Sequence, residues 1–519
     1  MKMINRKYLN KLVLFTIALF LCIQQASAIA PKTDFPVKGF HLDLRIQVMK
    51  MPALKTLALR LKKDGYNTLI MEYEATYPFQ KNPLISNRYA YTEAEIVDFI
   101  HFCGNLRIDV IPLQQSFGHV EYILRNNRYT LQREDQKDLS QVCPSKEELN
   151  RVLFTDLFTE LVKTHPSKYF HIGGDETHLL GHCPLCKAKV EKEGVSKLYA
   201  DHIRMLCDIV IKLGKIPIMW ADIALKYPDA LQYLPKQVIF VDWNYGWSLD
   251  KFGDHEKLMK SGFEIWGAAS LRSSPDNYNL TTWDKHFNNI RDFIPQSRKL
   301  GYKGMIMTSW STSGVYSPVL ESGYDLLDLV AVRRVYPITA FNMYIDAFAD
   351  ALKSTVPFDQ KKFVGQYCKT NYGFDEGQSA SFLKALTAVP YEVGNNKVKG
   401  PVSLKQLADS VAWSAGVLHA LEPTKNKDEY AQYVLLTDIR LQYLNYQMIE
   451  TEANSADFTA AQAPQLAGRL GDVMKKMTLL NSRYTALNEP VFYASELAQD
   501  NELHLAKIKM LFDRLNKSH

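Results

Sequence analysis

Cysteine is scarce in this sequence, which excludes a small secreted scaffold held together by disulfides. The 519 residues contain seven cysteines, one of which, Cys22, lies in an N-terminal apolar segment. The other six, spread over so long a chain, do not form the dense framework of a disulfide-rich domain. We therefore expect most of them to be buried as small apolar side chains.

A tract rich in lysine and arginine is also missing. The sequence has 62 basic and 56 acidic residues, for a formal net charge of +6. Four of the basic residues fall in the first 28 positions, so 58 basic residues face 56 acidic ones in the rest of the chain. Without a basic stripe, nucleic acid is not an expected partner.

Long apolar runs are limited to one, Leu12–Ile23, at the N-terminus. Basic residues precede this run, and the small residues Ala26–Ala28 follow it, as in a secretory signal peptide. We predict a signal peptide over residues 1–28, cleaved near Ala28, and a mature chain exported to the periplasm or the extracellular space. The run is too short to span a bilayer comfortably, and no integral membrane span is expected.

Short apolar segments recur between residues 37 and 310, each followed by a loop and often by a helical pattern. They are near-continuously apolar, as strands buried on both faces should be. Helices are predicted over residues 51–65 and 91–106, the second with Thr92 as its N-cap. Eight such units predict an α/β fold, a (β/α)8 TIM barrel over residues 29–330. The eight segments are 37–44, 67–73, 107–113, 168–174, 215–221, 237–243, 262–269 and 303–310.

The pattern changes after residue 330, where strand signals become rare. Apolar residues at three-to-four spacing predict an α-helical C-terminal domain over residues 331–519. Its tyrosine, tryptophan and methionine side chains are expected in the core of that domain. The helical stretches are 403–421, 428–449, 463–487 and 496–517.

Two adjacent carboxylates, Asp175 and Glu176, follow a pair of glycines in "HIGGDE" at the end of the fourth predicted strand. Catalytic groups of barrel enzymes lie at the C-terminal ends of the strands. The glycines allow the backbone to turn sharply there. Adjacent acidic residues are common on surfaces, but at the end of a buried strand they indicate a catalytic pair.

Aromatic residues close several of the later strands. Trp220, Trp243 and Trp310 stand at strand ends, and Tyr245 follows the second of them. A single tryptophan there is usually core, but several on one face are typical of the walls of a sugar pocket. Asp222 is a candidate to accept a hydrogen bond from a sugar hydroxyl.

Several segments of the chain resemble the family 20 glycoside hydrolases, the β-N-acetylhexosaminidases. They occur in the order of the hexosaminidase D-like branch, over roughly residues 37–320. The resemblance implies a retaining exo-hydrolase that removes terminal β-linked GlcNAc or GalNAc from a glycan or glycoconjugate, with no cofactor. The segments are "HLDLR" at 41–45, "LIMEYEATYPF" at 69–79, "VIPLQQSFGHVEYIL" at 110–124, "HIGGDETHLLG" at 171–181 and "PIMWADI" at 217–223.

Residue roles also follow from the resemblance. It implies substrate-assisted catalysis, in which the 2-acetamido oxygen of the sugar attacks the anomeric carbon and gives an oxazolinium intermediate. Asp175 would orient the acetamido group, and Glu176 would be the general acid and base. His119 would support Glu176 and would itself be backed by Glu74, with Glu72 as the competing carboxylate. Trp220, Trp243 and Trp310 would surround the acetamido group and the sugar ring.

The chain departs from the family pattern at two positions. Lys38 precedes Gly39 where many members have an arginine that binds sugar hydroxyls, and Arg45 is the candidate replacement. The tyrosine that polarises the acetamido carbonyl in many relatives has no clear match in "FEIWGAASL", and Tyr245 is the candidate substitute. The preference between GlcNAc and GalNAc therefore stays open.

A cluster of possible metal ligands, His178, His182, Cys183 and Cys186, follows the carboxylate pair. It could bind tetrahedral zinc or contain a disulfide. We expect a structural role and no catalytic metal. Two rival functions remain open: a metal-dependent exported hydrolase, and a glycan-binding barrel without catalytic activity.

Overall fold

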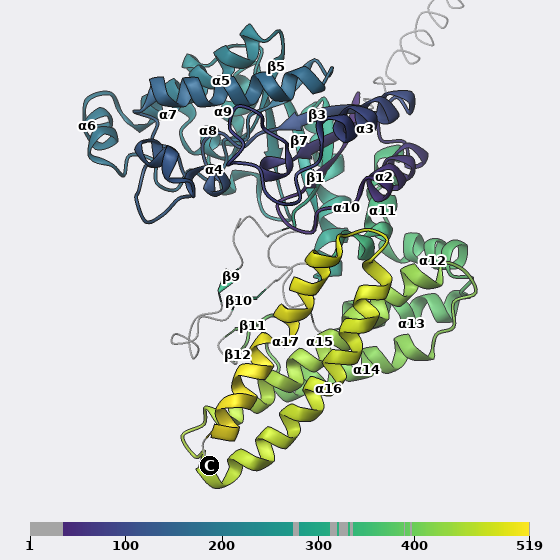
Figure 1. The fold of residues 1–519 in the computed structure, drawn as a ribbon. Coiled ribbons are helices and arrows are strands. Elements are labelled where there is room, and N and C mark those ends of the chain that lie inside the picture. Colours follow the sequence, from purple (N-terminus) through teal and green to yellow (C-terminus); the bar gives the residue numbers. More distant parts are fainter. Residues whose placement is uncertain are drawn as a thin grey trace, which may run out of the picture.

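A closed barrel of eight parallel strands forms the N-terminal part of the molecule (Figure 1). The computed structural model describes residues 35–272, 280–311, 336–388, 390–394 and 397–517, and the backbone of 319–320 and 331–332. The strands pair in sequence order, and β8 closes the barrel against β1. They are β1 (Val37–Asp43), β2 (Thr68–Glu72), β3 (Asp109–Leu113), β4 (Tyr169–His171), β5 (Ile216–Trp220), β6 (Ile239–Trp243), β7 (Glu264–Arg272) and β8 (Gly304–Ser309).

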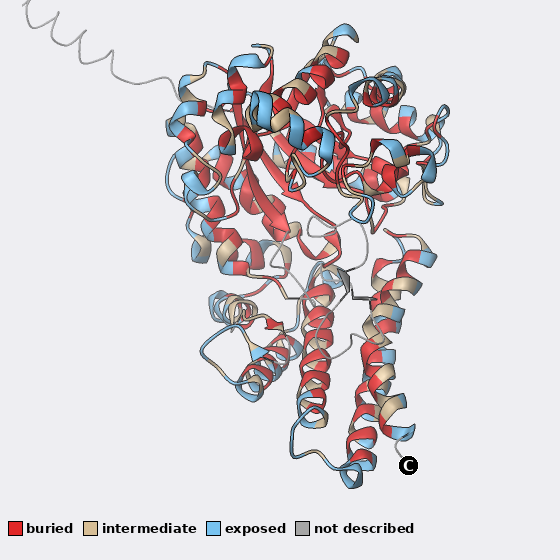
Figure 2. Ribbon diagram, turned by 90° about the vertical axis from the view of Figure 1, so that its left-hand side faces the viewer, coloured by how far each residue is buried: buried red, intermediate tan, exposed pale blue. Residues whose placement is uncertain are grey.

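The strands are apolar along their length because the barrel interior and the outer helices cover both of their faces. Every residue of β2 and β8 is buried, and Figure 2 shows the strands as the most buried part of the molecule. Isoleucines from β2, β3, β5, β6 and β8 fill the interior, so the barrel is a packed core and not a pore. Trp220, Tyr245 and Trp310 belong to the same interior cluster.

Helices surround the barrel in the order expected of alternating β/α units. Thr92 is the N-cap of α3, as predicted, and it forms a capping box: the Thr92 hydroxyl accepts from the Glu95 amide at 3.2 Å, and the Glu95 carboxylate accepts from the Thr92 amide at 2.8 Å. The helix over 51–64 ends at Gly65, whose φ of 97° is left-handed. The main barrel helices are α2 (Met51–Asp64), α3 (Glu93–Asn105), α5 (Glu147–Thr164), α7 (Val195–Lys212), α9 (His255–Lys260), α10 (Trp283–Leu300) and α11 (Asn342–Lys353).

Short elements lie in the loops between strands and main helices. They include the α-helices α4 (Glu121–Leu124), α6 (Pro184–Glu193) and α8 (Asp222–Lys226). The 3-10 turns are η1 (Glu74–Thr76), η2 (Asn127–Gln132), η3 (Pro228–Tyr233), η4 (Leu249–Lys251), η5 (Ile338–Ala340) and η6 (Ala460–Gln462). Several of these elements follow the C-terminal ends of strands, where the predicted catalytic residues lie.

A helical region packs beside the barrel (Figure 1). Its last four helices are neighbours in sequence order and form an elongated bundle. Two small antiparallel hairpins accompany them, β9 (Val319–Leu320) with β10 (Ala331–Val332), and β11 (Val393–Gly394) with β12 (Lys397–Val398). The helices are α12 (Gln360–Asn371), α13 (Glu376–Thr387), α14 (Leu404–Ala420), α15 (Lys427–Ala453), α16 (Ala463–Asn488) and α17 (Ala494–Lys517).

The predicted fold class is confirmed, as a (β/α)8 barrel followed by a helical region. The eight predicted strands and the four predicted C-terminal helices all form within a few residues of their expected bounds. α11, which was not predicted as a helix and lies within the predicted C-terminal domain, packs against both α10 and α2. The predicted signal peptide and the predicted boundary at residue 330 lie outside the described residues.

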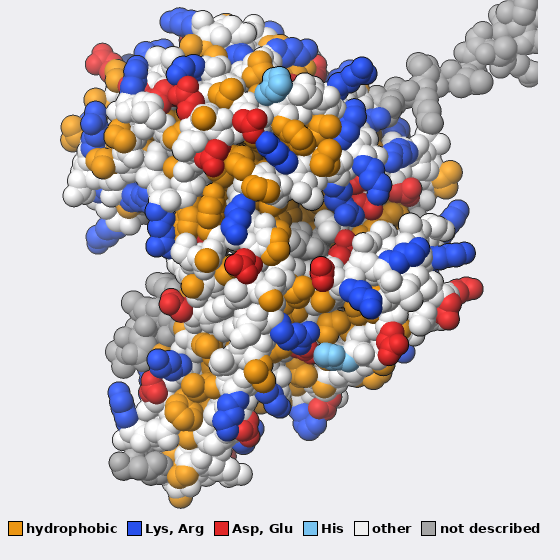
Figure 3. Space-filling view, turned by 45° about the vertical axis from the view of Figure 1, so that its right-hand side comes forward, with side chains coloured by type: hydrophobic (Ala, Val, Ile, Leu, Met, Phe, Trp, Pro, Cys, Tyr) orange, Lys and Arg blue, Asp and Glu red, His pale blue; other side chains and the backbone are white. Residues whose placement is uncertain are grey.

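The surface carries charges of both signs. Figure 3 shows lysine and arginine side chains interspersed with acidic and apolar ones over one face of the molecule. In the described part of the chain, no helix is both long enough and apolar enough to cross a bilayer.

Candidate active site

The backbone turns sharply where β4 ends, and this turn presents the two adjacent carboxylates. Gly173 and Gly174 have φ values of 71° and 90°, and Glu176 has a φ of 47°. Left-handed backbone is strained for a residue with a side chain. Because of this turn, Asp175 is buried, while the side chain of Glu176 stays 38% exposed at the mouth of the barrel. The turn of the backbone therefore brings both carboxylates to one site.

The loop after β3 lies directly against this turn. A Cβ atom on Gly118 would come within 2.4 Å of the Asp175 carbonyl oxygen, so only glycine fits there without a shift. The next residue, His119, also has a left-handed backbone, with a φ of 54°. The close approach of the two loops therefore fixes the position of His119 relative to the carboxylate pair.

His119 bridges the two carboxylates. Its Nε2 atom lies 3.4 Å from Asp175 Oδ2 and 3.3 Å from Glu176 Oε2. Burial lowers the pKa of His119, but the charge on Asp175 and hydrogen bonds to both carboxylates raise it well above its ordinary value. In return, the hydrogen bond from His119 lowers the pKa of Glu176, although burial opposes this. The two carboxylates therefore favour the charged, imidazolium form of His119.

Asp222 supports the strained turn from the end of β5. Its Oδ2 atom accepts a hydrogen bond from the Glu176 backbone amide at 3.0 Å, and its Oδ1 atom is buried without a protein partner. Burial raises the pKa of Asp222 to about 7, and the charge on Asp175 adds to the rise. Asp222 thus holds the catalytic turn in place, and its predicted hydrogen bond to a sugar hydroxyl stays a prediction.

Aromatic side chains line the barrel interior beneath the carboxylates. The rings of Trp220 and Trp310 lie 5.8 Å apart, and those of Trp243 and Tyr245 lie 5.2 Å apart. The Trp310 indole donates to the Tyr245 hydroxyl at 2.7 Å. Trp220 is almost fully buried at 1% exposure, whereas Trp243 is partly exposed. The four predicted aromatic residues are thus brought together at one end of the barrel.

His171, inside the "HIGGDE" motif, has a structural position. Its Nδ1 atom accepts a hydrogen bond from the Gly173 amide at 3.0 Å. The centroid of its ring lies 4.6 Å from that of the Trp220 ring. Burial lowers the pKa of His171 to about 3, so the ring is neutral. His171 therefore supports both the turn at Gly173 and the side chain of Trp220.

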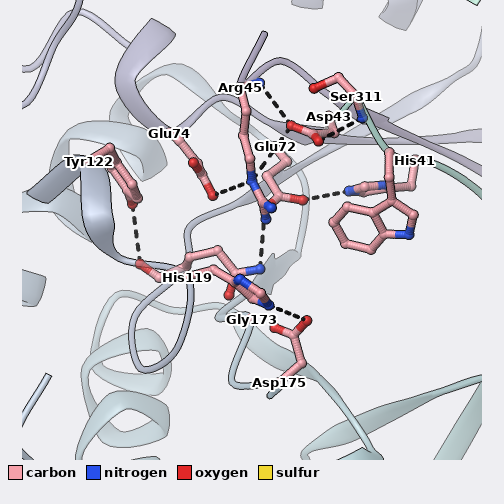
Figure 4. A network of polar contacts seen from close by, with 12 residues as sticks. His41, Asp43, Arg45, Glu72, Glu74, His119, Tyr122, Gly173, Asp175 and Ser311 are labelled. Carbon is pink, nitrogen blue, oxygen red and sulfur yellow. Dashed lines mark hydrogen bonds and ion pairs between the residues drawn. The ribbon is translucent and has the colours of Figure 1, made fainter. Parts of the chain in front are cut away.

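A buried charge network lies beside the site (Figure 4). Arg45 donates to Glu72 at 2.6 Å and to Glu74 at 3.1 Å, and its side chain is fully buried. Burial acts to raise the pKa of Glu72, but Arg45 and a hydrogen bond from His41 bring it well below its ordinary value. Burial raises the pKa of Glu74 well above its ordinary value, Arg45 opposes this rise, and the charge on Glu72 adds to it.

This network corrects two predictions. The direct pair of His119 and Glu74 does not form in this structure, because Glu74 pairs with Arg45 and His119 contacts Asp175 and Glu176. Arg45 is only 4% exposed and is surrounded by carboxylates, so it is not placed to bind sugar hydroxyls. Both departures arise because a buried guanidinium needs anionic partners, and the ends of β1 and β2 and the start of η1 supply them.

Polar atoms without protein partners gather at this end of the barrel. They are buried side-chain atoms of residues that lie in or next to the site described above. In a folded protein, a buried polar group is usually hydrogen-bonded, so a cluster of exceptions indicates a place for a polar ligand. The atoms include Asp175 Oδ1, Asp222 Oδ1, Trp220 Nε1, Trp243 Nε1, Gln115 Oε1 and Glu74 Oε2.

The comparison with protein families matches this region. Residues 43–270 match the model described as glycosyl hydrolase family 20, catalytic domain. The barrel is similar to the catalytic domain of this family. The match contains His119, the turn that carries Asp175 and Glu176, and Asp222 at the end of β5. Trp310, after β8, lies outside the matched segment. The protein is therefore a glycoside hydrolase.

Two animal proteins named hexosaminidase D are similar to this chain. The one from Bos taurus is 28% identical over 298 residues, which cover 54% of this chain and 86% of that protein. The one from Homo sapiens is 26% identical over 309 residues, which cover 56% of this chain and 63% of that protein. A β-hexosaminidase from Akkermansia muciniphila is 29% identical over 202 residues, or 35% of this chain and 37% of that protein.

Two solved bacterial structures superpose on part of this chain. The β-N-acetylhexosaminidase of Bacteroides fragilis superposes with a TM-score of 0.48 at 19% identity, over 65% of this chain and 70% of that one. The exo-β-N-acetylglucosaminidase of Vibrio harveyi gives a TM-score of 0.44 at 17% identity, over 61% and 54% of the two chains.

Proposed function

We propose that the protein is an exported, retaining exo-β-N-acetylhexosaminidase that hydrolyses terminal β-linked GlcNAc or GalNAc. The observation that carries the proposal is the Asp175–Glu176 pair, bridged by His119 at the mouth of an aromatic-lined barrel. The family match and the similarity to proteins named hexosaminidase support the class of sugar. The mechanism, the export and the preference between the two sugars go beyond those comparisons.

Asp175 is suited to the acetamido group of the substrate. Its Oδ1 atom is buried and lacks a partner, so it is available to accept a hydrogen bond from the acetamido N–H. As the acetamido oxygen attacks the anomeric carbon, positive charge develops on the nitrogen, and the carboxylate stabilises it. The glycosidic bond breaks, an oxazolinium ring forms, and water later opens it with overall retention of configuration.

Glu176 is suited to proton transfer because it is the more exposed of the two carboxylates. In the free protein its pKa is lowered, so it must gain a proton before it can act as the general acid. The imidazolium of His119 lies 3.3 Å away and is a proton source within reach. A bound sugar excludes water from Glu176 and raises the pKa of its carboxyl group, which favours transfer of the proton to Glu176.

Turnover of nitrophenyl β-glycosides tests the proposal most directly. The GlcNAc, GalNAc and glucose derivatives are compared in parallel at equal concentration. We expect release from one or both N-acetyl sugars and almost none from the glucoside, which lacks the acetamido nucleophile. Equal turnover of the glucoside, or a product of inverted configuration, would replace this mechanism with that of an ordinary two-carboxylate glycosidase.

Two controls address the rival functions. If activity is lost on dialysis against a chelator and restored by a metal that binds at the carboxylates, the protein is a metal-dependent hydrolase. If the sugars bind but no aglycone is released, the barrel is a glycan-binding module. Export is tested separately, by N-terminal sequencing of the secreted chain, which should begin near residue 29.

A further inference from the structure

Three cysteines and a glutamate meet outside the candidate active site, under the loops that follow β3 and β4. Cys143 Sγ lies 3.5 Å from the Sγ atoms of both Cys183 and Cys186. Cys186 Sγ lies 3.2 Å from Glu134 Oε2. One ligand atom from each of the four residues lies within 4.8 Å of the other three. The four atoms therefore enclose a common centre.

The spacing fits a tetrahedral metal site. With zinc–sulfur bonds of about 2.3 Å, the sulfurs of a tetrahedral zinc site lie roughly 3.8 Å apart. Cys183 and Cys186 are separated by two residues, and the Cys186 amide donates to Cys183 Sγ at 3.4 Å. This hydrogen bond directs both thiols of the Cys-X-X-Cys turn to the same side. Soft thiolates favour zinc over calcium or magnesium.

The charge and burial of these four residues also favour a bound metal ion. Cys143, Cys186 and Glu134 are each no more than 3% exposed. The described contacts of the Glu134 carboxylate are with the Cys183 amide at 2.7 Å and with Cys186, and no described ion pair joins Glu134 to a Lys, Arg or His. A buried carboxylate among thiols is costly unless a cation balances it. A divalent metal supplies that charge, whereas a disulfide would join only two of the three thiols and leave the carboxylate unbalanced.

We propose that Cys143, Cys183, Cys186 and Glu134 bind a structural zinc ion. This assignment replaces part of the predicted ligand set. His178 is exposed, and His182 is more than half exposed and pairs with Asp135 at 3.1 Å, so neither histidine belongs to the site. Cys143 and Glu134 come from the loop after β3, about 40 residues earlier in the sequence, and no local spacing pattern pointed to them.

The zinc ion would fasten two active-site loops together. On one side, the residue before Cys143, Val142, donates its amide to the Phe117 carbonyl at 3.1 Å, two residues from His119. On the other side, Cys183 follows the turn that carries Glu176, and the Leu179 amide donates to the Gln141 side chain at 3.0 Å. The metal therefore stabilises the relative position of His119 and Glu176 without touching the substrate.

Metal analysis of the full-length protein, purified without chelator, tests the proposal. We expect about one zinc per chain, and an X-ray absorption spectrum with three sulfur ligands and one oxygen at tetrahedral distances. Cys143→Ser and Cys186→Ser should lower the zinc affinity by more than the roughly 10- to 100-fold that loss of an outer partner costs. Cys103→Ser and Cys207→Ser are matched controls, because these buried cysteines lie outside the cluster and should leave the zinc content unchanged.

Other results would overturn the proposal. A chain without metal whose mass is lower by two hydrogens, with a mapped bridge between two of the three cysteines, would identify a disulfide. A chain without metal in which all three thiols react with iodoacetamide would show that the three cysteines are free thiols packed together, with neither a metal nor a disulfide. If the cysteine variants do not fold, Glu134→Gln retains the shape of the side chain and should still lower the zinc affinity. These measurements do not use enzymatic activity, so they stand apart from the proposed function.

Discussion

Strained residues gather where the chemistry is expected. In the described part of the chain, six residues other than glycine have a left-handed backbone, and four of them, Gln47, Glu74, His119 and Glu176, lie in the loops at the barrel mouth. Each such position costs on the order of 1–3 kcal/mol. The sequence predicted the carboxylate pair and His119 from motifs. It could not predict the partner of Glu74, since Arg45 is 29 residues away and its burial is visible only in the folded chain.

The two carboxylates that we propose as catalytic, Asp175 and Glu176, should respond differently to neutralisation. Glu176→Gln removes the proton donor, so we expect a loss of kcat of roughly 10²- to 10⁴-fold on substrates with poor leaving groups. An aryl glycoside with a good leaving group should be partly spared in its first step. Asp175→Asn loses the charge that stabilises the oxazolinium, so even the activated aryl substrate should be slow. Steady-state kinetics on both substrate types checks this, and identical profiles for the two variants would contradict separate roles.

The stability of the protein should depend on pH through His119. Its pKa is raised above the ordinary value of about 6.5, so its contribution is fully present below that pH and is lost as the pH rises through the raised value. Glu176, with a lowered pKa, contributes in the opposite sense: its share is lost as the pH falls below about 4.5. The difference in free energy of unfolding between the wild type and His119→Gln should therefore shrink from pH 6 toward alkaline pH. Chemical denaturation at several pH values measures it, and a constant difference would contradict this account.

Arg45 should be a determinant of stability rather than of sugar affinity. Arg45→Met leaves buried Glu72 and Glu74 without their cation, and we expect a loss of roughly 3–5 kcal/mol in free energy of unfolding. Arg291→Met is the matched control, because Arg291 pairs with Asp292 on the surface and should contribute no more than about 1 kcal/mol. Denaturant titration compares the two variants. An Arg45 variant that folds stably but has a raised KM would instead favour sugar binding.

At the scale of elements, the strands were predictable because burial on both faces leaves a continuous apolar signature. The loops were not, because their positions depend on contacts between units that are distant in sequence. The approach of the loop after β3 to the turn after β4 is one such contact, and no motif encodes its distance. The same holds for Cys143 and Glu134, which the fold brings to the Cys-X-X-Cys turn.

Gly118→Ala tests how tightly these two loops are coupled. The new Cβ would meet the Asp175 carbonyl at 2.4 Å, so the turn must shift. Overpacking of this kind typically costs 1–3 kcal/mol, and a displaced catalytic turn should also lower kcat. Gly104→Ala is the control, because it lies in α3 with nothing within 4 Å and should be neutral or stabilising by up to about 1 kcal/mol. Wild-type kcat and thermal stability in Gly118→Ala would show that the loops move freely.

At the scale of the whole molecule, a polar junction joins the barrel to the helical region. Glu429 on α15 accepts hydrogen bonds from Tyr367 at 2.6 Å and from Tyr372 at 2.7 Å. From the barrel side, Asn342 of α11 donates to Glu429 at 2.9 Å, and Arg60 on the barrel helix α2 lies 3.9 Å from the Glu429 carboxylate. A second contact joins the loop after β1 to the segment between α16 and α17, where the Lys50 amide donates to the Val491 carbonyl at 2.8 Å. The sequence predicted a helical region but gave no sign of where it would pack.

Glu429→Gln should weaken this junction. Hydrogen bonds to a charged group contribute roughly 1.5–3 kcal/mol each, so loss of the charge should lower the melting temperature measurably. The heat-capacity profile should then separate into two transitions as the barrel and the helices lose their coupling. Glu452→Gln, on the same helix in an exposed pair with Arg469, is the control and should have little effect. An unchanged single transition in the Glu429 variant would show that the junction is not what couples the two parts.

The left-handed backbone at Glu176 and at its neighbour His119 has a consequence for laboratory evolution. Glycine adopts this conformation at no steric cost, so at these two positions the substitution that relieves the backbone strain also removes the side chain proposed for the reaction. A library selected for heat tolerance alone would be drawn toward glycine there and would accumulate robust but inactive proteins. Selection that alternates heating with turnover avoids this outcome, and the positions that then resist change identify the residues that the reaction requires.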